Sequence, residues 1–234
     1  MHQKTTKTKM WHNLLIPIWI LGIASFGISL LDIFERMSHN PEPYRAVFIG
    51  MGIMTVIYFL LKKSIYFRWV QTLSHELTHA LFGILARNKI TKFNVSLRGN
   101  ENGSLGFVEQ EGSSHFIITL TPYCFPIFTY FLLIFRPFLE GDLLFTYDII
   151  LGATYAYHLW TFFQQMGTHQ TDFTRSGILF SYTFVFFVNF LLLGFFFSYI
   201  GGGLDGITHF FQSGLHYAQS ILYDLANYIS RFIT

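Results

Sequence analysis

The chain has 234 residues, of which 52% are hydrophobic, 20% are aromatic and only 12% are charged. Soluble domains carry about 25% charged residues, so this composition excludes an ordinary soluble globule and indicates an integral membrane protein. The formal net charge of +2, without a basic patch, argues against a nucleic-acid partner, and the single cysteine, Cys124, excludes an internal disulfide and a cysteine-based zinc site.

The N-terminus, residues 1–9, is polar and basic, and a long apolar run follows it. That run is too long for the apolar part of a signal peptide and no small-residue cleavage site follows, so we expect a retained first membrane helix. Six segments are apolar enough and long enough to cross a bilayer, which needs about 20 residues each. They are residues 12–32, 45–61, 65–86, 115–135, 143–166 and 177–200.

The positive charges at the ends of the six segments are divided almost evenly between the two sides, so the orientation is predicted from the first helix alone. Six crossings place both chain ends on the same side of the membrane. Lysines 4, 7 and 9 precede the first helix, so the positive-inside rule predicts a cytoplasmic N-terminus.

The third apolar segment contains His75-Glu76-Leu77-Thr78-His79, a His-Glu-x-x-His pattern. On a helix, His75 and His79 share one face, so their imidazoles can bind one Zn²⁺. Glu76 is then placed to act as general base on a zinc-bound water. Ionisable groups at membrane depth are costly unless they have partners, which favours a metal site over histidines that merely hydrogen-bond to their neighbours.

Between the third and fourth apolar segments lies the part of the chain with strand character. Phe93, Val95 and Leu97 alternate with polar residues, and the turn region Gly99–Gly103 leads to a second apolar piece at 105–108. The pattern predicts a β-hairpin, with an ordinary polar loop as the alternative.

Pro122 and Pro126 lie inside the fourth apolar segment. Because proline removes a backbone donor, they should break or kink this helix. Backbone freed within a membrane must line a cavity or find protein partners, so a substrate could approach here.

After Gly201-Gly202-Gly203, apolar residues recur at helical spacing towards the chain end. This predicts an amphipathic helix over about 207–233, lying at the membrane surface or docked on a partner protein. No repeat or composition shift separates a second domain, so residues 1–234 are predicted to form a single membrane domain.

The chain resembles the site-2 protease family of intramembrane zinc peptidases in the order of three features. These are a His-Glu-x-x-His motif in a membrane helix, a hairpin at 90–110 and a proline break at Thr121-Pro122. The resemblance covers roughly residues 66–195, and only the motif residues match strongly. It implies a zinc-peptidase-like core, cleavage of membrane-spanning substrates, and an aspartate from a later helix as third zinc ligand.

The resemblance leaves open which aspartate is the third ligand. Asp172 opens a helix, as the family's ligand does, and is our first choice, although aspartate is also a common N-cap. Asp205 precedes a glycine, as the family's ligand usually does, but it falls after the last membrane segment. His169, Asp148 and His158 are the further candidates.

We therefore expect an all-α polytopic membrane protein with about six transmembrane helices, a short β-hairpin after the zinc-binding helix and a C-terminal amphipathic helix. We expect a zinc metalloendopeptidase that cleaves membrane protein substrates within the lipid bilayer. Its catalytic base would be Glu76, and its zinc ligands would be His75, His79 and Asp172. The alternative is a non-proteolytic zinc-binding membrane scaffold or complex subunit of the same fold.

Overall fold

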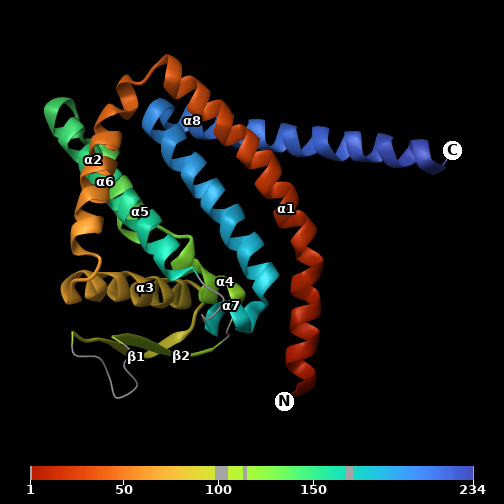
Figure 1. Cartoon of the computed structure of the whole chain (residues 1–234), viewed down its shortest axis with the longest axis horizontal. Coiled ribbons are helices and arrows are strands. Elements are labelled where there is room, and N and C mark those ends of the chain that lie inside the picture. Colours follow the sequence, from red (N-terminus) through yellow and green to blue (C-terminus); the bar gives the residue numbers. More distant parts are fainter. Residues whose placement is uncertain (1, 98–104, 113–114, 167–170, 234) are drawn as a thin grey trace. The chain divides into compact units, whose positions relative to one another are not determined.

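The structure, a computed structural model, describes residues 2–97, 105–112, 115–166 and 171–233 (Figure 1). These residues form helices, connecting turns and one antiparallel pair of strands. The chain divides into two compact units. The terminal unit comprises Met1–Tyr44 and Arg175–Thr234, and the central unit comprises Arg45–Thr174.

The terminal unit pairs the two ends of the chain. Its elements are α1 (His2–His39), η1 (Glu42–Tyr44) and α8 (Ile178–Ile233). α8 consists of two helical segments that meet at Gly203, whose φ of 58° and ψ of −139° are not helical. The ring of Phe26 on α1 packs against that of Phe210 on α8, and Tyr217 donates a 2.8 Å hydrogen bond to Asp32. Aromatic and polar contacts therefore both join these helices.

The predicted C-terminal helix is the part of α8 beyond Gly203. It carries large apolar side chains that are exposed in this chain, among them Leu215, Leu222, Leu225 and Ile229. Its docking on a membrane surface or on a partner protein stays a prediction.

The central unit contains most of the remaining elements. They are α2 (Arg45–Leu61), α3 (Ile65–Leu85), β1 (Lys89–Val95), β2 (Gly106–Glu111), α4 (Phe116–Leu120), η2 (Thr121–Tyr123), α5 (Ile127–Leu133), η3 (Arg136–Phe138), α6 (Gly141–Gln165) and the start of α7 (Thr171–Ser176). α2 and α6 lie side by side (Figure 1). Glycines at positions 50 and 152 allow their backbones to approach closely, since a Cβ at Gly50 would clash with the backbone of Ile149 and a Cβ at Gly152 with that of Val47.

α3 ends in a turn that leads directly into the hairpin. Two backbone hydrogen bonds close it, from Arg87 N to Ile84 O at 2.9 Å and from Asn88 N to Gly83 O at 2.8 Å. Arg87 has a φ of 62°, the left-handed conformation that closes many helices. The chain reverses there, so the hairpin runs alongside α3 (Figure 1).

The predicted hairpin is confirmed. β1 and β2 are antiparallel, with Lys89 opposite Glu111 and Val95 opposite Gly106. β1 begins four residues before the predicted Phe93, because it starts as soon as the turn after α3 is complete. The predicted turn region, 99–103, lies outside the described residues.

Among the described residues, three helical segments are long and apolar enough to cross a membrane, namely Trp11–His39, Glu42–Leu61 and Ile178–Arg231. A fourth crossing arises if Phe116–Tyr123 and Ile127–Phe138, which meet at 86° where a proline break was predicted, form one broken span. These apolar helices indicate a membrane protein with three or four candidate spans among the described residues. The predicted count of six membrane helices is not confirmed, because α3 and α6 are helices that are not among the segments apolar enough to cross a membrane. The cytoplasmic N-terminus stays a prediction.

Candidate metal centre

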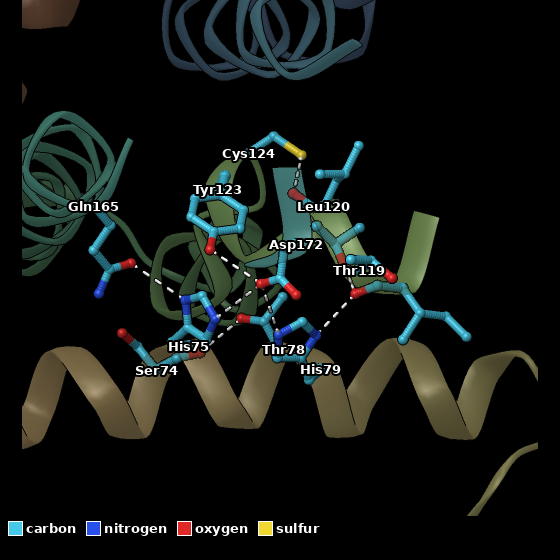
Figure 2. A network of polar contacts seen from close by, with 12 residues as sticks. Ser74, His75, Thr78, His79, Thr119, Leu120, Tyr123, Cys124, Gln165 and Asp172 are labelled. Carbon is cyan, nitrogen blue, oxygen red and sulfur yellow. Dashed lines mark hydrogen bonds and ion pairs between the residues drawn. The ribbon is translucent and has the colours of Figure 1, made fainter. Parts of the chain in front are cut away.

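His75 and His79 project from one face of α3 towards Asp172 at the start of α7 (Figure 2). The Nε2 atoms of His75 and His79 lie 4.0 Å and 3.9 Å from the same carboxylate oxygen, Oδ2 of Asp172. Each residue offers one ligand atom, and these atoms lie within 4.8 Å of one another. The fold thus brings together the three predicted ligands, in the only such group within the described part of the chain.

The donor set fits zinc. Zinc with ligand distances of about 2.0–2.1 Å holds its tetrahedral ligands roughly 3.3 Å apart. The pairs at 4.0 Å and 3.9 Å would therefore close by roughly 0.7 Å, and the two histidine nitrogens, which lie within 4.8 Å of each other, by up to roughly 1.5 Å. The side chains of His75, His79 and Asp172 are 16%, 15% and 24% exposed, so the group is largely shielded without being sealed. Three protein ligands leave a fourth position open, as catalytic zinc sites require.

The Nδ1 atom of each imidazole, the nitrogen that does not face Asp172, has a hydrogen-bonding partner of its own. Nδ1 of His79 lies 2.9 Å from the carbonyl oxygen of Ile118, which can only accept a hydrogen bond. Nδ1 therefore carries the proton, and Nε2 keeps its lone pair free for a metal. Nδ1 of His75 lies 3.3 Å from Oε1 of Gln165 at the end of α6. Such partners fix the orientation and tautomer of metal-binding histidines.

Asp172 is held by Tyr123, whose hydroxyl donates a 3.1 Å hydrogen bond to Oδ2 (Figure 2). Tyr123 is only 1% exposed, and its ring meets the ring of His75 edge-on at 5.2 Å. It directly follows Pro122 in η2, so the break in this segment brings it to the centre. Sequence reasoning missed Tyr123 and Gln165. The prolines marked the segment around Tyr123 as irregular, whereas no sequence feature distinguished Gln165.

Glu76 is half-buried on α3 and lies next to the hairpin. A Cβ built at Gly106 would stand 3.1 Å from Cγ of Glu76 and 2.7 Å from Cγ2 of Thr72. Only glycine therefore lets the first residue of β2 approach α3 this closely. The hairpin thus borders the side chain predicted to act as base.

The other candidate ligands do not join this group. Asp148 accepts two hydrogen bonds from Arg136, at 2.8 Å and 3.0 Å, so both of its carboxylate oxygens are engaged. His158 lines a cavity beside the centre but is not among the clustered ligand atoms. Asp205 is exposed on α8 in the terminal unit. His169 lies outside the described residues.

The sequence model of the Peptidase M50B-like family matches residues 48–191, which is more than half of the chain. The matched range includes α3, the hairpin, the bent segment, α6 and Asp172, and therefore every element that contributes to the candidate centre. Neither a curated protein nor a solved structure matches the chain. The resemblance in the sequence is thereby confirmed, and the chain belongs to the Peptidase M50B-like family of site-2 proteases.

Proposed function

We propose that this protein is an intramembrane zinc metalloprotease that hydrolyses a peptide bond of a membrane-spanning protein. The observation that carries the proposal is the group of three ligand atoms within 4.8 Å of one another, with Glu76 next in sequence to one of them. Membership of a peptidase family that generally uses zinc, together with three or four apolar helices, supports it.

In this proposal His75, His79 and Asp172 are the residues that hold the metal. Bound zinc supplies a Lewis acid that polarises the peptide carbonyl and makes a water molecule more acidic. Ile118, Gln165 and Tyr123 keep the three side chains oriented through the hydrogen bonds described above. Holding the ligands in advance avoids the cost of ordering them when substrate arrives.

Glu76 moves the protons of the reaction. Its carboxylate accepts a proton from the attacking water and later gives one to the departing amide nitrogen. A half-buried position suits this role, because the carboxylate is shielded yet still reachable by water and substrate.

The substrate chain must be extended at the cleaved bond, because a helix hides its peptide groups. The hairpin offers a template for this, since the two-stranded sheet formed by the described residues leaves one edge of each strand open to a further strand. β2 begins next to Glu76, so a substrate strand added to the hairpin would run close to the base.

A non-proteolytic scaffold or complex subunit is the second candidate. The exposed apolar side chains on the last part of α8, such as Leu222 and Leu225, favour it because they suit a docked partner. A scaffold keeps the metal for structure and has no use for a base at position 76.

Glu76→Gln separates the two candidates. The full chain, purified in lipid nanodiscs, would be given synthetic membrane-spanning peptides with six randomised central residues, and mass spectrometry would map the cuts. We expect Glu76→Gln to keep its zinc and to lose about 10²–10⁴-fold in cleavage rate, the usual contribution of a general base. His79→Ala should lose both zinc and cleavage.

Glu35→Gln, at an exposed carboxylate on α1, is the matched control and should behave like the wild type. Cleavage that is unchanged in Glu76→Gln would contradict the protease and favour the scaffold.

A further inference from the structure

A wholly apolar groove opens on the central unit between α2, α3, α5 and α6. It has a volume of about 310 Å³, at the lower end of the range of ligand pockets, and no polar atom of its lining is exposed in it. Its walls include Met54, Val70, Phe128, Ile150, Ala153 and Tyr157. None of these residues has a role in the mechanism proposed above.

The groove adjoins a small cavity that reaches the metal centre and is lined by both polar and apolar side chains. This cavity has a volume of about 20 Å³, enough for one water molecule, and its lining includes Ser74, His75 and Gln165. Phe128, Thr154 and Tyr157 line both spaces. A single layer of side chains therefore separates the apolar groove from the surroundings of His75.

Tyr157 forms part of that layer and has a different environment at each end. Its hydroxyl lies 2.9 Å from Oγ of Ser74, the residue before His75. Its ring packs against those of Phe67 and Phe128, each with 5.9 Å between ring centroids. The polar end thus belongs to the metal-centre side, and the ring belongs to the apolar side.

The position of the groove along α3 matches the spacing of an extended peptide. Val70 precedes His75 by five residues, roughly 7.5 Å along the helix axis at about 1.5 Å per residue. An extended chain advances about 3.3 Å per residue. For a substrate that runs parallel to α3, this axial separation places a side chain in the groove two or three residues from the bond at the metal centre.

We propose that this groove is the subsite for one large apolar side chain of the substrate, two or three residues from the cleaved bond. The proposal rests on the proposed protease function. α2, which forms one wall, is apolar enough to span a membrane, so the groove opens at bilayer depth. Because the groove exposes no polar atoms, it can bind an aliphatic or aromatic side chain. It disfavours the peptide backbone, whose polar groups would find no hydrogen-bonding partners there.

The peptide pool described above tests this with variants of the groove. Val70→Phe and Ala153→Leu fill it from two different helices. We expect wild-type cleavage to favour Leu, Ile, Met or Phe over Ala by about tenfold or more at the position two or three residues from the cut. The filled variants should lose this preference yet still cleave peptides that carry Ala there.

Phe128→Ala enlarges the groove and should shift the preference at this substrate position towards the larger side chain of Trp. This effect is opposite to that of the variants that fill the groove. Ile53→Phe changes an α2 side chain that is 49% exposed and does not line the groove, so its profile should equal that of the wild type.

Two results would overturn the proposal, and they are distinguishable. If the wild type cleaves the pool and the three groove variants keep its profile, the groove does not receive a substrate side chain, while the protease function stands. If the zinc-loaded wild type cleaves no peptide of the pool, the subsite and the protease function fail together.

Discussion

At the scale of single residues, the third ligand is the most consequential assignment. Oδ2 of Asp172 lies about 4 Å from both histidine Nε2 atoms, whereas Asp205 is exposed on α8. We expect Asp172→Ala to bind zinc far more weakly, because only two protein ligands remain. Asp205→Ala should keep the zinc content of the wild type. Elemental analysis of both purified variants measures this, and full zinc content in Asp172→Ala would contradict the assignment.

Tyr123 is expected to act through Asp172. Tyr123→Phe removes the hydroxyl that donates to Oδ2 but keeps the ring that packs against His75. Partners of metal ligands typically contribute about 10–100-fold in metal affinity, so we expect zinc to bind at least about tenfold more weakly. Competition with a zinc chelator measures the affinity.

Tyr223→Phe is the control, since that side chain is 68% exposed on α8. Equal zinc affinity in Tyr123→Phe and Tyr223→Phe would show that Tyr123 has only a packing role.

At the scale of elements, the close approach of β2 to α3 makes a prediction about the hairpin. Gly106→Ala places a Cβ 2.7 Å from Cγ2 of Thr72 and 3.1 Å from Cγ of Glu76, so the strand or one of these two side chains must shift. We expect cleavage of the peptide pool to fall at least about tenfold while zinc stays bound, because a small displacement of a catalytic group is costly. Gly52→Ala on α2, where a Cβ meets nothing within 4 Å, should cleave normally. Equal rates in the two variants would mean that this contact does not position the base.

The buried ion pair between η3 and α6 predicts a stability effect without a metal effect. The side chains of Arg136 and Asp148 are 16% and 7% exposed. Asp148→Ala removes the carboxylate of this buried ion pair, and breaking such a pair typically lowers the free energy of unfolding by about 3–5 kcal/mol. Thermal unfolding of the nanodisc-bound protein measures the loss, and Asp142→Ala, at an exposed site, should change little. A loss of zinc from folded Asp148→Ala would restore Asp148 as a candidate ligand.

At the scale of the whole molecule, local patterns predicted the elements well. Apolar run lengths indicated the helices, alternation over residues 93–108 indicated the hairpin, and the prolines marked the place where the fourth segment bends. These features depend on neighbours in the sequence, so sequence reasoning can reach them. The number of membrane crossings was not confirmed, because α3 and α6 are helices whose apolarity falls short of what a span requires.

The candidate metal centre could be predicted from the sequence only for residues that are close to one another along the chain. The i, i+4 spacing placed His75 and His79 on one face of a helix. Asp172 was chosen through a resemblance to a family, because nothing in its own sequence context distinguishes a ligand from an N-cap. The contacts of Tyr123 and Gln165 arise from tertiary packing across a helix break and a helix end, and no sequence pattern encodes them.

Zinc-edge X-ray absorption on the purified full chain tests the central claim most directly. The account predicts one zinc per chain, bound by two imidazole nitrogens at about 2.0–2.1 Å, a carboxylate oxygen and one further light atom. In His79→Ala the spectrum should lose one imidazole shell or the metal altogether. A wild-type protein without zinc, or a zinc environment that His79→Ala leaves unchanged, would contradict the account.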